Sequence, residues 1–386
     1  MKTIIKYIII TLFIIFFYSQ LFAAVNDPVG FGAKNSPSSP VILERIHFRR
    51  YFHLRYSFID NAPDNKVNED HWSLRRFKLI TDWKLSNRLQ FYSQFIYKTN
   101  NYSSADDRVY LQDAFLKLFV IRQFNFMVGQ FKPPVGWERF QPDLRLPVIE
   151  QSQAIDRLIP NGSLGESFVR DYGFQCFGKL SPVFQYEFTM MAGSGAHTKL
   201  SDKNAPLVVG RLSFKKKFKD PVFNKKMELL LQLANSQRWD TDNDFTRQLP
   251  GCDKNIFRHF SGRDNRYDYV IAINLERSQF AAEYLSTEYL ADDDGQVKTR
   301  ASGWFLEHSY FLIDNWQYVV RYEQFDPDHA KKDGHDLAWF TLGLDYYFNK
   351  KSGRLMVNYI IKNEATNGLR NNMLVVQFQY FLFGGK

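Results

Sequence analysis

Residues 337–362 read LAWFTLGLDYYFNKKSGRLMVNYIIK, two stretches of alternating apolar and polar residues joined by a short polar turn. In an extended chain Phe340 and Leu344 share one side, while Asp345 lies on the other. The second stretch repeats this pattern, with Val357 opposite the charged residues. The pattern predicts an antiparallel hairpin that has one apolar face and one charged face.

The same unit repeats from about Ile46 to Phe383, which predicts an all-β chain of about sixteen strands. We expect these strands near 46–58, 72–85, 88–98, 109–121, 123–132, 171–180, 183–192, 206–218, 227–236, 268–276, 279–290, 299–312, 316–325, 337–348, 354–362 and 372–383.

The connections between the predicted strands alternate between short and long. A tight turn at Ser86 and Asn87 is followed by a long gap at 99–108, and the longest connection is 133–170. This alternation is typical of a transmembrane antiparallel β-barrel with short periplasmic turns and long extracellular loops. An even number of strands places both ends of the barrel on the periplasmic side.

The N-terminal region reads as an export signal. Two lysines precede the apolar run 7–17, and a more polar stretch ends at Ala24. We therefore predict a signal peptide at 1–24, a short periplasmic segment at 25–45, and a barrel domain at 46–386. The alternative is an uncleaved anchor, but the apolar run is shorter than the roughly 20 residues of a spanning helix.

The composition agrees with a barrel in a membrane. Aromatic residues make up 17% of the chain, although its mean hydropathy is only −0.37. Lipid-facing residues in such a barrel occupy every second position, and its closed sheet satisfies all backbone groups. A soluble β-sandwich is the alternative, but it does not explain long loops on one side. Aromatic side chains near strand ends, which we expect in the interfacial girdles, are Trp72, Trp83, Trp304, Trp316 and Trp339.

The charged face of the strands must line the lumen, because a charge on the lipid face costs roughly 2–4 kcal/mol at mid-bilayer. The basic residues that we expect to select anions from the lumen wall are Arg49, Arg55, Arg76, Lys78, Arg211, Arg321 and Arg354. Further inward positions are Lys84, Lys215, Lys217 and Lys362, and the acids opposite them are fewer: Asp82, Glu307, Glu323 and Asp345. Removing Lys2 and Lys6 with the signal lowers the net charge from +9 to +7. A barrel of this size with a polar interior predicts an aqueous channel rather than a packed core.

The segment 111–140, LQDAFLKLFVIRQFNFMVGQFKPPVGWERF, resembles the phosphate-selective porin O and P family. Flanking segments agree: RRFKLITDWKLSNRLQFYSQF at 75–95, RYEQFDPD at 321–328, DYYFN at 345–349 and FQYFLF at 378–383. The chain departs from this family's pattern by lacking a dense run of lumen arginines that aligns residue by residue, and by continuing past the terminal aromatic to Lys386.

The resemblance implies a sixteen-stranded outer-membrane channel of a Gram-negative-type bacterium, assembled as a homotrimer. It also implies that the third long loop, here 133–170, folds inward to narrow the pore. The anion-selectivity residues that it implies for this constriction loop are Lys132, Arg139, Arg145, Arg157 and Arg170.

Other classes of function find little support. No serine, histidine and acid stand at a readable catalytic spacing, so we expect no enzyme and no cofactor. Cys176 and Cys252 are too few for a disulfide framework and lack metal-ligand spacing. Acidic tracts at 240–244 and 292–294 fall in outer loops, where solvated charge is the simplest reading. Nucleic acid is an unfavoured partner, since the basic residues are interleaved with lipid-facing aromatics.

The sequence therefore predicts passive diffusion of small anions, phosphate or polyphosphate included, through a basic lumen. Rings of Lys or Arg select anions in such pores. Two alternatives remain open: a general, non-selective porin, and a structural or surface-interaction barrel whose lumen is closed. Outer-membrane lipid and lipopolysaccharide are the expected surroundings.

Overall fold

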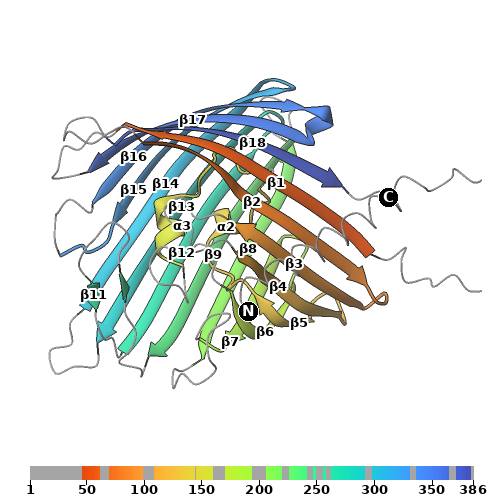
Figure 1. The fold of residues 1–386 in the computed structure, drawn as a ribbon. Helices are drawn as coiled ribbons and strands as arrows, with labels where there is room; N and C mark the ends of the chain where they lie inside the picture. Colours follow the sequence, from red (N-terminus) through yellow and green to blue (C-terminus); the bar gives the residue numbers. More distant parts are fainter. Residues whose placement is uncertain are drawn as a thin grey trace, which may run out of the picture.

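A computed structural model gives the fold (Figure 1). It describes residues 46–60, 69–98, 108–143, 145–159, 170–193, 206–219, 226–240, 247–248, 255–257, 262–291, 298–330, 336–364 and 371–383. The predicted signal peptide, the segment 25–45, most of the long connections and the last three residues lie outside this part.

In the described part of the chain, sixteen antiparallel strands form one closed barrel. They are β1 (Ile46–Ile59), β2 (Glu69–Lys84), β3 (Leu89–Lys98), β4 (Arg108–Phe119), β5 (Asn125–Phe131), β6 (Asp171–Lys179), β7 (Phe184–Met191), β8 (Leu207–Lys219), β9 (Lys226–Asp240), β12 (Gly262–Asn274), β13 (Ser278–Ala291), β14 (Lys298–Ile313), β15 (Trp316–Asp326), β16 (Leu337–Phe348), β17 (Gly353–Glu364) and β18 (Met373–Phe383). Pairing of β1 with β18, from Arg49 opposite Phe383 to Ile59 opposite Met373, closes the barrel.

Four short elements complete the described structure. Strands β10 (Arg247–Gln248) and β11 (Asn255–Phe257) form a separate two-stranded sheet, and a 3-10 turn η3 (Asn349–Lys351) joins β16 to β17. Two helices, α2 (Trp137–Phe140) and α3 (Gln153–Arg157), lie between β5 and β6 in the sequence. No helix in the described ranges has the length and apolar character needed to cross a bilayer.

The sixteen predicted strands are confirmed, with one shift of boundary. Strands β9 and β12 reach Asp240 and Gly262, whereas the prediction ended them near 236 and 268. The extension was read as a loop because its inward residues are charged. In the structure Arg266 and Asp264 form a buried ion pair on the inner face, 2.8 Å apart, so charge here belongs to the wall.

Large apolar side chains of the outer face are exposed, as a lipid-facing surface requires. Leu233, Leu306 and Leu342 are among them, and the polar residues that alternate with them point inward. One predicted girdle residue is misplaced. Trp339 lies opposite the inward-facing Glu323, and the Lys362 ammonium sits over its ring.

The expectation of an unpacked interior is wrong for the middle of the barrel. A buried apolar cluster joins α3 to the inner wall of β5, β7, β8, β9 and β13–β16, and it includes Phe131, Ala154, Ile155, Leu158 and Phe325. Alternation reports which residues face inward, but it does not report a segment that enters the lumen and covers them.

Candidate functional site

The connection between β5 and β6 enters the barrel, and Figure 1 shows α2 and α3 inside the ring of strands. We call its described residues, 132–143 and 145–159, the inward loop. Gly136 begins the turn into α2 with φ = 84°, a left-handed conformation that favours glycine. A Cβ at this position would lie 2.8 Å from Ile155 Cδ1 of α3. The glycine therefore permits both the turn and the close approach of the two helices.

Carboxylates of the wall accept hydrogen bonds from the first backbone amides of α2. The Gly136 N–H donates to Asp268 of β12 at 2.9 Å. The Trp137 and Glu138 N–H groups donate to the two carboxylate oxygens of Glu283 of β13, at 2.6 and 3.0 Å. Amides at a helix start lack partners within the helix, so these carboxylates both satisfy them and fix the loop to the wall.

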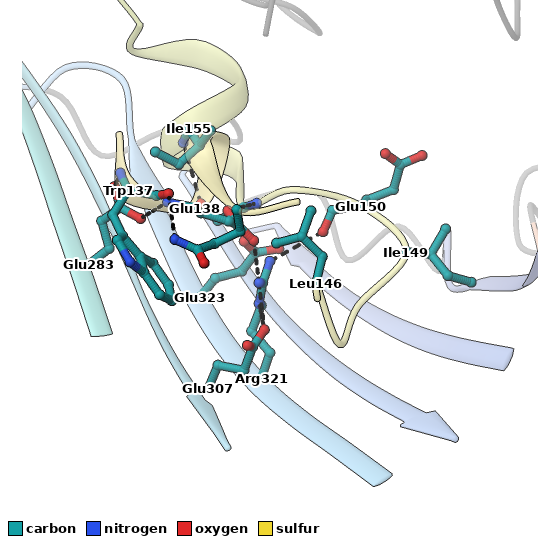
Figure 2. Close-up of polar contacts among 12 residues, drawn as sticks. Trp137, Glu138, Leu146, Ile149, Glu150, Ile155, Glu283, Glu307, Arg321 and Glu323 are labelled. Atoms are coloured by element: carbon teal, nitrogen blue, oxygen red, sulfur yellow. Dashed lines mark hydrogen bonds and ion pairs between the residues drawn. The ribbon is translucent and has the colours of Figure 1, made fainter. Parts of the chain in front are cut away.

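Arg321 of β15 is the central cation of the same contact region (Figure 2). Its guanidinium donates to Glu307 of β14 at 2.6 and 2.9 Å and binds Glu138 of the loop. It also lies 4.6 Å from the ring centre of Phe305. All three charged side chains are almost completely buried. Arg321 thus joins the loop to two neighbouring strands.

Backbone groups of the loop are held on the opposite side of the lumen as well. Arg354 of β17 donates to the Leu146 carbonyl at 2.6 Å and forms an ion pair with Asp345 at 2.6 Å. The Ile149 N–H donates to the Asn358 side chain at 2.8 Å. The loop therefore contacts the wall on both sides of the barrel.

Two loop carboxylates form ion pairs with β1 and β2. Asp143 accepts from Lys78 at 3.0 Å, and Glu150 binds Arg55. Burial raises the pKa of Glu150, but Arg55 and Arg75 outweigh it and lower the pKa to about 2. Burial likewise raises the pKa of Asp143, and Lys78 overcomes it, so this pKa is also lowered. These anchors are complete above the ordinary carboxyl pKa of about 4 and are lost only as the pH falls toward 2.

Helix α3 sits on a glycine of the wall. A Cβ on Gly303 of β14 would lie 2.8 Å from the Ala154 Cβ and 3.0 Å from the Gln324 carbonyl oxygen. Ala154 is 1% exposed. Gly303 thus leaves the space in which α3 packs.

Replacing Gly303 by valine is therefore expected to displace α3, at a cost of about 1–3 kcal/mol for overpacking. Displacement exposes Arg157, the last residue of α3, so limited trypsin digestion of the folded protein should cleave there faster. Gly210→Val is the matched control, because a Cβ on Gly210 meets no atom within 4 Å. Equal cleavage rates in the two variants would show that Gly303 does not seat the helix.

All seven predicted wall cations lie on the inner face, but they differ in what they contact. Arg55, Arg321 and Arg354 hold the loop, as described above. Arg76 lies 3.8 Å from Asp143, so with Lys78 it faces the same loop carboxylate. Arg211 pairs with Glu187 and lies 4.5 Å from the ring centre of Phe140, and Arg49 lines a small cavity.

The five predicted loop cations are not gathered at one point. Arg170 pairs with Asp113 at 3.0 Å, and the Lys132 ammonium donates to the Arg139 carbonyl at 2.9 Å. Burial and the neighbouring Arg170 lower the pKa of both Lys132 and Arg139, which indicates a crowded basic group. Arg157 lies apart, 5.1 Å from the ring centre of Phe325. Arg145 is exposed, and among the described residues no ion pair involves it.

Two cavities flank the loop. The larger, of about 1310 Å³, lies between the loop and the inner wall from β7 to β9 and from β12 to β16, and Arg145 projects into its lining. The smaller, of about 270 Å³, is lined by Arg49, Lys78 and Lys132. Both cavities are lined by Phe140 and Gln141, so they adjoin at these two loop residues.

A set of basic residues in the larger cavity was not among the predicted sites. They are Lys215, Lys217, Lys219, Lys226 and Lys351. Lys215 and Lys217 both contact Glu228, at 2.9 and 3.5 Å, and Lys219 lies directly opposite Lys226. Alternation had placed Lys215 and Lys217 inward. Their neighbours were read as a solvated turn, and only the register of β8 with β9 extends the row to the rim.

Comparisons with known proteins agree with this geometry. A family model described as "Phosphate-selective porin O and P" matches residues 48–382. Among curated proteins, none matches the chain significantly.

Solved structures show the fold. An anion-selective porin from Comamonas acidovorans has a TM-score of 0.58 at 11% identity, covering 87% of this chain and 99% of that one. The loop L8 deletion mutant of OmpT, an outer membrane protein of Vibrio cholerae, gives 0.59 at 11% identity, with coverage of 87% and 99%. The trimer form of in-vitro folded OmpT from the same organism gives 0.56 at 11%, again with 87% and 99%.

Proposed function

This chain is an outer-membrane β-barrel porin of the phosphate-selective porin O and P family, and we propose that it lets small anions diffuse passively beside its inward loop. Phosphate and polyphosphate are included among these anions. The excess of basic residues in the larger cavity carries the proposal. That cavity is lined by seven cations, Arg145, Arg211, Lys215, Lys217, Lys219, Lys226 and Lys351, against three acids, Glu187, Glu228 and Glu276.

Such a lining favours anions for a simple electrostatic reason. Basic side chains replace the water of an entering anion and raise a barrier against cations. Guanidinium groups suit phosphate in particular, because their fork donates two parallel hydrogen bonds, whereas lysine acts as a point charge. Arg145 and Arg211 therefore provide the phosphate contacts in the larger cavity.

The smaller cavity supplies a second basic step. Arg49, Lys78 and Lys132 meet there, and burial next to Arg170 lowers the pKa of Lys132. An entering anion offsets the repulsion within this group, so its binding is favourable. We assign Arg55, Arg321 and Arg354 a different role, that of positioning the loop on which these contacts depend.

We further propose that the protein is a homotrimer in the outer membrane. The support is its family and its fold, which it shares with an OmpT structure described in a trimer form. Small anions are then the transported partners, and lipid and lipopolysaccharide are the surroundings of its outer face.

One observation favours the alternative of a closed, structural barrel. The apolar packing of α3 on the wall fills part of the lumen, so the barrel conducts only through the space that the loop leaves.

Proteoliposomes loaded with inorganic phosphate and potassium separate these functions. We expect the reconstituted protein to release phosphate much faster than potassium, with short polyphosphate slowing the phosphate efflux. Protein-free liposomes provide the background rate. Release of neither ion above that background would support the closed barrel, and release of both at equal rates would support a general porin.

A further inference from the structure

The outer face of β12, β13 and β14 carries a group of cations near the end of the barrel with the long connections. Lys298 and Arg300 both contact Glu288, at 3.1 and 2.7 Å, and their side chains remain 39% and 54% exposed. Arg263 lies 4.8 Å from the ring centre of Trp239. Among the described residues this patch thus has three cations and one carboxylate.

The strand register places these cations within reach of one ligand. Arg263 and Lys298 lie opposite Leu290 from its two sides. Neighbouring strands are about 4.8 Å apart, so the two backbones are separated by about 10 Å. Arg300 pairs with Glu288 in the adjacent outward-facing row. A ligand with one or two phosphate groups matches this spacing and charge.

Farther from the rim, the same three strands change in chemistry row by row. The next outward row holds the hydroxyl side chains of Tyr267, Ser286 and Ser302, which lie opposite one another. The row after it is aromatic and consists of Tyr269, Tyr284 and Trp304.

Beyond the aromatic row the surface is hollow and apolar. Two adjoining cavities, of about 550 and 400 Å³, share Ile271, Ala282 and Leu306 in their linings. The hollow exists because Ala282 is small between two exposed aliphatic side chains. It lies six residues along β13 from Glu288, or about 20 Å.

We propose that this surface binds lipopolysaccharide, the phosphorylated and multiply acylated glycolipid of the outer leaflet. Phosphates contact Arg263, Lys298 and Arg300, the sugars meet the hydroxyl row, and an acyl chain lies in the groove over Ala282. The end with long connections faces outside, so the site lies in the leaflet that contains this lipid. A phospholipid has phosphate and acyl chains but no sugar to fill the hydroxyl row.

The site is on the face away from the lumen, so it does not rest on the proposed transport. Residues 292–294, three aspartates next to Lys298 in the sequence, supply a competing route in which a divalent cation bridges acid and phosphate. Binding must therefore be measured with and without a chelator.

The test is native mass spectrometry of the detergent-purified protein with added lipopolysaccharide. We compare a charge variant, Arg263→Glu with Arg300→Glu, and a groove variant, Ala282→Phe, with two controls. Lys216→Glu is the charge control, on the outer face near the other rim, and Val357→Phe is the groove control, on the outer face of β17. Lipid with its phosphates removed and phosphatidylglycerol are the comparison ligands.

Each site variant is expected to weaken binding of lipopolysaccharide about ten-fold, with little change in either control and in the presence of chelator. Removal of the phosphates should weaken binding to the native protein similarly, and phosphatidylglycerol should bind more weakly than lipopolysaccharide. Equal binding by all variants, or complete loss of binding with chelator, would overturn the proposal. A change in oligomeric state in the Ala282→Phe variant without a change in lipid binding would assign the groove to a second copy of the chain instead.

Discussion

Replacing Arg321 by methionine is expected to release the inward loop from β14 and β15. The change leaves Glu138 and Glu307 buried without the cation that they share. Removing one partner of a buried ion pair costs about 3–5 kcal/mol, because the remaining charge has no compensation. Freed from the wall, the loop no longer narrows the lumen, so the variant should conduct more and select less. Single-channel conductance and thermal unfolding are the two measurements.

The control for this variant is Arg277→Met. Arg277 pairs with Asp314 at a distance of 3.2 Å, but both side chains are largely exposed, and such pairs contribute about 0–1 kcal/mol. Adding Glu138→Gln and Glu307→Gln to Arg321→Met removes the uncompensated charges and should restore part of the stability. If Arg321→Met has the conductance and stability of the native protein, Arg321 does not hold the loop.

Reversing the charge of Arg145 is expected to give the largest loss of anion selectivity. Arg145 is exposed in the lining of the larger cavity, and among the described residues no ion pair neutralises it. Arg145→Glu removes one cation and adds one acid at the loop surface, with little packing to disturb. The zero-current potential across a planar bilayer under a potassium chloride gradient should therefore move several-fold toward the cation-selective direction.

The matched control is Arg157→Glu, since Arg157 lies on the ring of Phe325 rather than in either cavity. We expect only a small shift of the potential in this variant. An unchanged potential in Arg145→Glu, or an equal shift in both variants, would remove the loop surface as the selectivity element. Arg139 belongs with the stability variants, because it is 2% exposed.

The barrel could be predicted from the sequence because period-two alternation is a local property of each strand. Residues such as Leu342 and Leu344 needed no knowledge of their neighbours to be placed outside. The same rule placed Arg55, Arg321 and Arg354 inside correctly. It failed for Asp264 and Arg266, whose charges pair across the inner face and so resemble a loop.

The contacts of the inner face could not be predicted in the same way. Arg321 and Arg145 carry the same charge, but one binds two buried glutamates and the other projects into a cavity. This difference depends on where the inward loop turns, which is decided by Gly136 and by the seat that Gly303 leaves for α3. Such contacts join residues more than a hundred positions apart, and alternation carries no record of them.

The most direct test of the anion pathway is the zero-current potential of the native protein in a planar bilayer under a potassium chloride gradient, before and after phosphate is added. A basic path beside the inward loop predicts a potential whose sign shows chloride crossing faster than potassium, together with a fall in chloride current as phosphate occupies the cations. A potential of the opposite sign that phosphate leaves unchanged would contradict this account.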